Sequence, residues 1–367
     1  MSEELPTLCA PPAVDFPKLQ SKSQPEDFIV EELPLYEPSG AGTHAYFFVE
    51  KRQLNTLDAA RRIAHFFKKR PADAGIAGLK DAQAITRQWI SLEHVPDAQR
   101  AMEISDAQLK VLAVSAHGNK LKMGHLKGNR FVIRLRPDMR LTNEQQTAVG
   151  ARAKEVLAKL QKTGVPNYFG EQRFGRYGDN AELGRKLVQG DKAGFDELFS
   201  KSGSRRPPDR RLRNLLVNAF QAELFNQVLA RRMPEIYRIQ AGDLAQLHRN
   251  GAVFAVASDA DSTREQPRAD AFEISPSGPM FGPKMPRPTG VPGEIEAAVL
   301  AECGVSCEDF GRDEAERQPG ARRPLRIPLL EAPEAKVDEA GLELRFALPP
   351  GAYASVVIRE LLWKPDA

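Results

Sequence analysis

Two segments far apart in the chain alternate apolar and polar residues, and a block of different composition separates them. In the segment 129–136, Phe131, Ile133 and Leu135 take every second position, and the segment 341–348 has the same period. In a strand, successive side chains point to opposite faces of the sheet, so an apolar residue at every second position is typical of a half-buried strand. If both segments belong to one sheet, the sequence between them forms an inserted domain.

The N-terminal third adds further strand and helix signals. Residues 43–50 are rich in aromatic and β-branched residues, which predicts a strand, and another strand is expected at 88–92. Between them, Asn55 is predicted to cap a helix, because Asp58 offers a carboxylate three residues further on. Residues 117–129 are loaded with Lys and Gly and indicate a hairpin.

The middle of the chain is more helical and has more loops. Helices are predicted at 144–162 and 210–232, each ending ahead of a proline. Residues 258–293 are rich in Pro, Gly and Asp, which predicts irregular structure and mobile loops. A last helix is expected at 354–363. The predicted fold class is mixed α/β, of the α+β kind.

Charge is more informative in its distribution than in its sum. The chain has 367 residues, 41% of them hydrophobic, which is enough for one large domain or two of medium size. Its net charge of +3 does not by itself indicate a nucleic-acid partner. Basic residues cluster, however, at 61–62, 68–70, 205–206, 210–213 and 322–323. Such clusters are compatible with a phosphate-binding face, and equally with solvated helix faces.

The cysteines and the N-terminus indicate the compartment. Cys9, Cys303 and Cys307 cannot build a disulfide framework, and no His or second Cys pair accompanies the last two at metal-ligand spacing. We expect idle thiols in a reducing cytoplasm. The first residues are acidic and lack the apolar core of a secretory signal, and no apolar run approaches the roughly 20 residues of a membrane span. A cytoplasmic protein without membrane association is predicted.

A glycine-rich bend at 75–89 carries one carboxylate, Asp81, between Lys80 and Arg87. Nearby cations favour the charged form of an acid, so Asp81 is expected to be ionised at neutral pH. An ionised carboxylate with no second acid close in sequence suits a nucleophile better than a general acid. The alternative is a turn or capping aspartate, a role that Asp often takes after glycine.

Four segments together resemble the TruD family of tRNA pseudouridine synthases. They are 25–32, 78–89, 164–175 and 348–361, and a weaker match lies at 127–131. They follow the family's order and extend over nearly the whole chain. The resemblance implies an isomerase that converts uridine to pseudouridine at position 13 of tRNA. It also implies a pseudouridine synthase catalytic domain with a mixed, mainly antiparallel sheet, interrupted by an inserted TRUD domain. The expected catalytic domain comprises residues 1–165 and 326–367, and the expected inserted TRUD domain comprises residues 166–325.

The resemblance also implies the catalytic residues. Asp81 matches the catalytic nucleophile, and Lys22 matches the active-site lysine. Lys80 is expected to face away from Asp81, since neighbours on an extended segment point to opposite sides. Attack on C1′ of the ribose, addition to C6 of the uracil and support of a glycal-like intermediate all stay open as the role of Asp81.

Substrate-binding residues are implied in the same way. The target base must leave the RNA stack, and Phe28, Phe131 and Tyr353 match aromatic pocket positions, although the family usually carries Phe where Tyr353 stands. Asn129 is expected to meet a uracil edge or the ribose. The alternatives are core packing for Phe131 and a turn role for Asn129.

The segment 167–175 has two interpretations. Arg173 is expected to bind a phosphate, while Tyr168 or Phe169 stacks on a base. The other interpretation is a structural hinge between the domains. The basic clusters at 205–213 and 322–323 are expected to contact the RNA backbone without regard to sequence.

The reaction implies few other components. Nothing is added to or lost from uridine, so neither a cofactor nor a metal is expected, and the partner is tRNA bound to a monomer. A non-catalytic RNA-binding protein or RNA chaperone on the same scaffold is the main alternative. A carboxylate-based nucleoside hydrolase is a third, although it commonly needs a second carboxylate or a metal.

Overall fold

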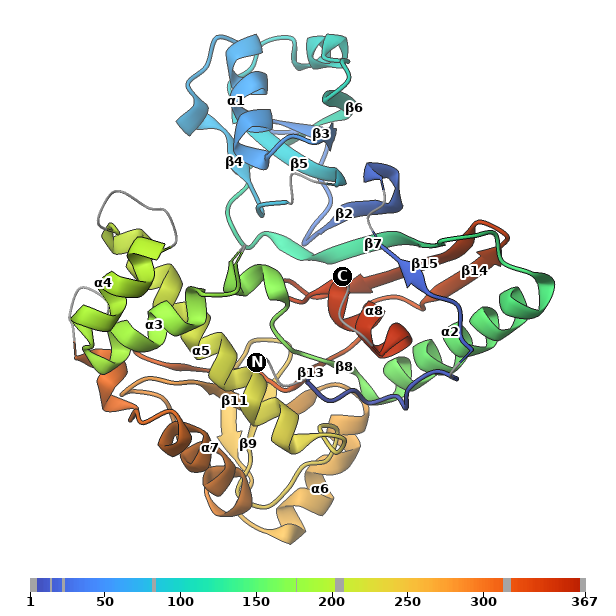
Figure 1. Ribbon diagram of the computed structural model, residues 1–367. Coiled ribbons are helices and arrows are strands. Elements are labelled where there is room, and N and C mark those ends of the chain that lie inside the picture. The colour runs from blue at the N-terminus through green and yellow to red at the C-terminus, as the bar shows by residue number, and fades with distance from the viewer. Residues whose placement is uncertain are drawn as a thin grey trace. The chain divides into compact units, whose positions relative to one another are not determined.

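The computed structural model describes residues 5–13, 15–21, 24–80, 84–175, 177–201, 208–312 and 318–363. The described residues form two compact units. Figure 1 shows their helices and strands, coloured by residue number from the N-terminus to the C-terminus. The sheet unit comprises residues 11–161 and 329–354. The helical unit comprises residues 5–10, 162–328 and 355–363.

The described residues of the sheet unit build a nine-stranded sheet. In spatial order its main strands are β14 (Glu334–Asp338), β15 (Gly341–Leu348), β7 (Leu126–Pro137), β2 (Phe28–Pro34), β5 (Ile85–Glu93), β3 (His44–Arg52) and β6 (Leu109–His117). Two short strands pair beside this path, β1 (Leu19–Gln20) with β7 and β4 (Gly75–Ile76) with β5. The β2–β5 pairing is parallel, and the other pairings described in this sheet are antiparallel. The predicted mixed, mainly antiparallel sheet is confirmed.

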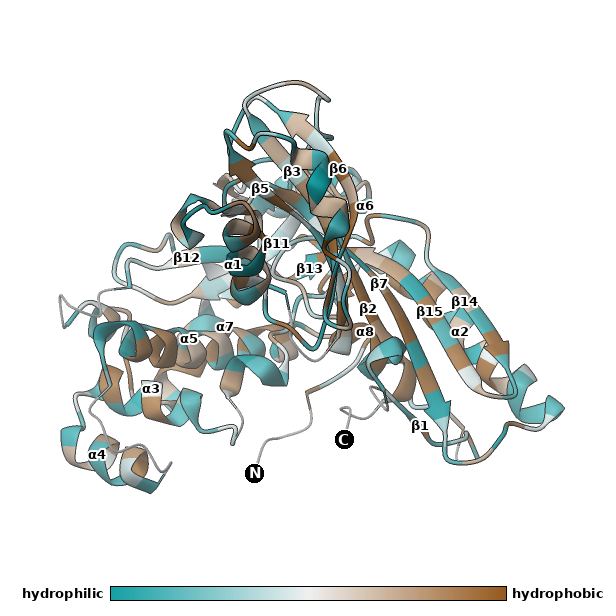
Figure 2. Ribbon diagram, turned by 90° about the horizontal axis from the view of Figure 1, so that it is seen from above, coloured by the Kyte–Doolittle hydropathy of each residue, from teal (hydrophilic) through white to brown (hydrophobic). Residues whose placement is uncertain are grey.

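The two alternating segments that lie far apart in the sequence are neighbours in this sheet. On β7 and β15, Leu135 stands opposite Leu342 and Phe131 opposite Phe346. All four side chains are buried. Figure 2 shows the alternation as brown and teal bands along β15. Strands from before and after the central part of the chain therefore share one hydrophobic face.

Two helices accompany this sheet. α1 (Thr56–Phe66) begins as predicted, because the side chain of Asn55 accepts a hydrogen bond from the backbone N–H of Asp58 at 2.8 Å. Its apolar face packs with β3, β5 and β6 in one core cluster. α2 (Asn143–Thr163) lies beside β14 and β15 in Figures 1 and 2. Short 3-10 turns complete the unit: η1 (Pro25–Asp27), η2 (Pro71–Asp73) and η3 (Ala98–Glu103).

The predicted hairpin at 117–129 is wrong. β6 pairs with β3, whereas β7 pairs with β2 and β15, so the connection crosses the sheet instead of joining neighbours. Leu121 in the middle of the connection is buried, and its N–H donates to Oγ of Ser91 on β5 at 3.0 Å. The Gly- and Lys-rich composition signalled a turn correctly but does not determine which strands pair.

The helical unit is organised around one long helix. α5 (Arg210–Arg232) has the predicted bounds and packs against α3 (Asn180–Gln189), α7 (Gly290–Glu302) and β11 (Ile274–Met280). Its buried Phe220, Leu224 and Val228 belong to the main core cluster of the unit. The remaining helices are α4 (Lys192–Lys201), α6 (Asp259–Asp270), α8 (Ala354–Leu362) and the 3-10 turns η4 (Glu171–Phe174) and η5 (Glu308–Gly311).

Two small sheets support these helices. One has four strands in the order β10 (Val253–Ala255), β9 (Leu244–Leu247), β11 and β12 (Ala321–Pro324). The other pairs β8 (Val165–Pro166) with β13 (Arg326–Ile327).

The prediction of irregular, mobile structure at 258–293 is wrong, because this range contains α6, β11 and the start of α7. Ser258 caps α6 by accepting a hydrogen bond from the N–H of Asp261, and Pro267 lies in the last turn. On β11, residues 274–279 are buried in spite of two prolines. Polar and proline-rich composition was mistaken for the absence of regular structure.

Within the described ranges, none of the helices combines the length and apolar character needed to cross a membrane.

Candidate active site

The two predicted catalytic residues, Lys22 and Asp81, lie outside the described residues. Their flanking segments are described, however. η1 and β2 follow Lys22 closely, and residues 78–80 lead directly to Asp81. The site is therefore built from these flanks.

Three linked hydrogen bonds, two of them buried, hold the segment before Asp81. The backbone N–H of Lys80 donates to Oγ1 of Thr56 at 2.9 Å, and Thr56 Oγ1 donates to Oε1 of Gln88 at 2.9 Å. The amide of Gln88 donates in turn to the carbonyl oxygen of Gly78 at 3.2 Å. Thr56 and Gln88 are buried, so these bonds replace water for groups that must be satisfied. α1 and β5 thus hold the backbone one residue ahead of the predicted nucleophile.

The side chain of Lys80 joins two neighbouring strands. Its Nζ lies 2.9 Å from Oε2 of Glu32 on β2 and donates to Oδ1 of Asn129 on β7 at 2.7 Å. The Lys80 and Glu32 side chains are only 5% and 1% exposed. Burial raises the pKa of Glu32, while the positive charge of Lys80 acts in the opposite direction. The expectation that Lys80 faces away from Asp81 concerns a residue outside the described ones.

The position of Gly78 beside the ion pair explains why the motif begins with a glycine. A Cβ at this position would lie 3.3 Å from Nζ of Lys80 and 3.9 Å from Oε2 of Glu32. A larger side chain would crowd the ion pair, so glycine lets the chain pass directly beside it.

Phe28, Asn129 and Phe131 are brought to one face of the sheet. Glu32 stands opposite Asn129 in the pairing of β2 with β7, and Phe28 lies on the same side of β2 as Glu32. The rings of Phe28 and Phe131 are 6.1 Å apart at 62°, and Phe131 stacks at 5.5 Å on Phe346. Both predicted pocket rings are buried. The arrangement is compatible with a base pocket beside Asn129 and with core packing.

Tyr353 lies between β15 and α8, in the sheet unit, and is half-buried. Its predicted pocket role stays a prediction.

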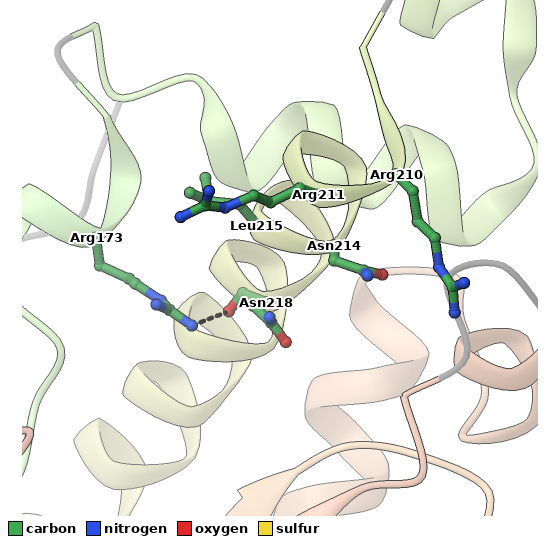
Figure 3. Close-up of a pocket in the computed structure, with 6 residues that line it drawn as sticks. All are labelled: Arg173, Arg210, Arg211, Asn214, Leu215 and Asn218. Carbon is green, nitrogen blue, oxygen red and sulfur yellow. Dashed lines mark hydrogen bonds between the residues drawn. The ribbon is translucent and has the colours of Figure 1, made fainter. Parts of the chain in front are cut away.

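Arg173 belongs to the helical unit, where it lines a hollow of about 540 Å³ that we call the arginine hollow. The lining residues are Arg173, Arg210, Arg211, Asn214, Leu215 and Asn218. Figure 3 shows Arg173 and Arg211 on one side of α5, and Arg210 on the other. Nη2 of Arg173 donates to the carbonyl oxygen of Asn218 at 3.5 Å. Two basic motifs that are separate in the sequence therefore line the same surface depression.

The aromatic residues beside Arg173 do not share its exposure. Tyr168 and Phe169 are both buried. Phe169 packs edge-on against Phe225, and the guanidinium of Arg323 lies 4.1 Å from its ring centroid. These contacts favour the structural interpretation of the segment, and the stacking of either ring on a base stays a prediction.

The predicted RNA contact of the 322–323 cluster is wrong for Arg322. Its guanidinium is buried and pairs with Glu296 at 2.8 Å. It also donates to Oγ of Ser277 at 3.1 Å. Its place on β12 turns the side chain inward, which the sequence of two adjacent arginines does not reveal.

Residues suited to metal or redox chemistry are dispersed. In the part of the chain that the structure describes, no three His, Cys, Asp or Glu side chains lie close enough together to hold a metal ion. The three cysteines are free, and burial raises the pKa of the Cys303 and Cys307 thiols. Raised thiol pKa values disfavour the reactive thiolate.

Sequence reasoning missed Glu32, Thr56 and Gln88. Glu32 did leave a signal, because it follows Phe28 and Val30 at a spacing of two and so lies on the apolar face of its strand. A carboxylate on a buried face needs a cation nearby. Thr56 and Gln88 gave no comparable signal.

Known proteins resemble the chain over nearly its whole length. A family model described as TruD, tRNA pseudouridine synthase D, matches residues 19–211 and 200–361. The protein named tRNA pseudouridine synthase D of Geobacter metallireducens is 39% identical, with 94% of this chain and 95% of the relative covered. That of Anaeromyxobacter dehalogenans strain 2CP-C is 42% identical, with 94% and 92% covered.

Among solved structures, a Methanosarcina mazei protein assigned as tRNA pseudouridine synthase D matches with a TM-score of 0.78. The match covers 98% of this chain and 96% of that protein, at 24% identity. At this identity the likeness concerns the fold, and it supports the mixed α/β arrangement over the whole chain.

Proposed function

The chain belongs to the TruD family, and from this premise we propose that it is an isomerase that converts uridine to pseudouridine at position 13 of tRNA, with Asp81 as the nucleophile. The single observation that carries the proposal is the match of family and relatives across nearly the whole chain. The anchored segment 78–80 supports it, because a nucleophile must be held in place to react.

The reaction needs no added reagent. The bond between C1′ of the ribose and N1 of uracil breaks, the base turns, and a new bond joins C1′ to C5. The proton on C5 leaves and N1 gains one, so atoms and electrons balance within the nucleotide. A carboxylate can take part by attacking C1′, by adding to C6 or by assisting a glycal-like intermediate.

The remaining residues receive roles within this proposal. Lys22 is the cationic partner of Asp81, and Phe28, Phe131 and Tyr353 enclose the extruded base. Asn129 meets the edge of the uracil. Residues 1–165 and 326–367 form the catalytic domain, and 166–325 form the inserted TRUD domain. The protein acts as a cytoplasmic monomer.

Arg173 contacts the tRNA backbone in this proposal. The arginine hollow supports this role, since Arg210 and Arg211 add exposed cationic side chains to the same depression. Guanidinium groups bind phosphate oxygens through paired N–H donors.

The test is conversion of unmodified tRNA by the purified protein with a chelator and without cofactor, followed by mapping of pseudouridine. The wild-type protein is expected to modify one uridine. Asp81→Asn is expected to lower the rate by more than about 10³-fold, as loss of a nucleophile does, and to leave tRNA binding intact. Asp73→Asn is the matched control, because Asp73 pairs with Arg70 on the surface of the same unit.

Each alternative has its own outcome in this experiment. tRNA binding without product in the wild-type protein favours the RNA-binding protein or chaperone. Release of free uracil favours the nucleoside hydrolase. Full activity of Asp81→Asn would remove Asp81 from the mechanism.

A further inference from the structure

The orientation of the Asn129 amide is decided by its contact with Lys80. The oxygen and the NH2 group of an amide have nearly the same size, so their partners determine which way the group faces. The ammonium of Lys80 has only donors, and it lies 2.7 Å from Oδ1 of Asn129. A flipped amide would place N–H groups against the ammonium. The oxygen of Asn129 therefore faces Lys80, and its NH2 group points the other way.

Lys80 is itself held in place. Lysine usually has a flexible side chain, but here Glu32 neutralises the ammonium at 2.9 Å and the backbone N–H is bonded to Thr56. Gly78 lies directly beside the ion pair. Burial of both charged groups makes separation of the pair costly, because an unpaired charge would remain in the interior. The orientation of the Asn129 amide is thus set in advance.

The NH2 group of Asn129 can donate a hydrogen bond to a ligand. Among the described residues it has no hydrogen-bond acceptor, and Asn129 is half-buried rather than covered. Phe131 lies two residues further along β7 on the same face, where an aromatic ring can lie beside a base. Uracil presents carbonyl oxygens at C2 and C4, whereas cytosine carries an amino group at C4.

From this geometry we infer that the Glu32–Lys80 pair is a positioning device for substrate recognition. It fixes the Asn129 amide so that its NH2 group donates a hydrogen bond to a carbonyl oxygen of the target uracil. Lys80 and Glu32 act through Asn129 and do not touch the base. The inference rests on the proposed function, since it assumes that a uridine is bound beside Asn129.

A double-mutant cycle tests whether Lys80 acts through Asn129. kcat and KM for pseudouridine formation are measured for Lys80→Met, Asn129→Ala and the combination. Each single variant is expected to lose about 10- to 100-fold in kcat/KM, as loss of a residue that orients a ligating group does. The combined variant is expected to match Asn129→Ala within about threefold, because Lys80 has nothing left to orient. Multiplied losses would overturn the inference.

Two further variants separate positioning from folding. Lys80→Met combined with Glu32→Gln removes both charges, so no unpaired charge stays buried. This variant is expected to unfold near the wild-type temperature and still to lose kcat/KM. Wild-type kcat/KM in this folded variant would overturn the inference. Lys80→Arg keeps a cationic donor and is expected to recover part of the activity, and Lys110→Met, an exposed lysine on β6, is the matched control.

Substituted tRNAs identify the carbonyl oxygen. The target uridine is replaced by 2-thiouridine or 4-thiouridine, whose sulfur is a weaker acceptor than oxygen. The wild-type protein is expected to lose kcat/KM with one of the two, and Asn129→Ala is expected to be insensitive to that replacement. Equal sensitivity of both proteins to both analogues would overturn the inference. A wild-type protein that makes no pseudouridine would overturn the proposed function as well, whereas an active protein with an additive cycle would overturn this inference alone.

Discussion

The helical unit contains arginines in two opposite environments. Arg322 is buried and paired with Glu296, whereas Arg210 and Arg211 lie exposed at the arginine hollow. In the sequence both sets are short runs of basic residues. A buried charge is costly unless it is paired, while an exposed charge in a depression is accessible to a large anionic ligand. Burial, rather than clustering along the chain, separates the structural Arg322 from the arginines that are proposed to contact tRNA.

The largest effect on stability is expected at the buried guanidinium of Arg322. Glu296→Ala leaves the guanidinium of Arg322 without its anion, and we expect the free energy of unfolding to fall by about 3–5 kcal/mol. Chemical denaturation measures the change. Glu294→Ala, an exposed glutamate on the same helix, is the control and is expected to change stability by less than about 0.5 kcal/mol. Equal effects of both variants would remove the distinction between the two environments.

A smaller effect of a different kind is expected at the arginine hollow. Replacing Arg210 and Arg211 together by Gln should weaken tRNA binding about tenfold and make its salt dependence shallower by about two charges. The unfolding free energy should stay the same, since both side chains are exposed. Filter binding at several salt concentrations measures the affinity.

Arg238→Gln is the control for this variant, because Arg238 is exposed in the same unit but does not line the arginine hollow. If it weakens tRNA binding as much as the double replacement does, the hollow has no special role.

The smallest effect concerns Glu32, where burial and pairing oppose each other. Because burial raises its pKa, the folded protein holds this proton more tightly than the unfolded chain does. The contribution of Glu32 to stability therefore falls as pH rises from its ordinary value of 4.5 toward the raised pKa. The slope for one proton is at most about 1.4 kcal/mol per pH unit. Glu32→Gln should lose this part of the pH dependence.

Urea denaturation of wild type and Glu32→Gln at several pH values between about 4.5 and 7 measures this difference. Glu93→Gln, on the neighbouring strand β5, controls for the loss of a surface charge. A pH slope that is steeper in Glu32→Gln than in wild type would contradict the sign of the pKa shift.

The sequence predicted regular elements best where period and stop signal agree. The bounds of α5 and β15 were predicted to the residue, because an apolar period ends at a clear break in each. The range 258–293 was missed because its regularity depends on a capping serine and on burial by neighbouring strands. Composition alone contains neither piece of information.

The sequence could predict which residues belong to the candidate site, but not which of them contact one another. Asn129 and Phe28 could be singled out from motifs, whereas the bond between Lys80 and Asn129 joins positions 49 residues apart. The pairing of β2 with β7 sets Glu32 opposite Asn129, and Lys80 reaches both from a segment outside these strands. Neither local sequence predicts this contact. The burial of Arg322 was missed for the same reason.

The pairing of β8 with β13 has a consequence for how this chain tolerates change. Val165 faces Ile327 there, so the long stretch between them leaves and returns within one interstrand spacing of about 4.8 Å. When a surface loop inside that stretch is lengthened or shortened, the pairing of β8 with β13 can keep the two ends of the stretch at the same separation. Surface loops inside the stretch are therefore the places where insertions are expected to be tolerated.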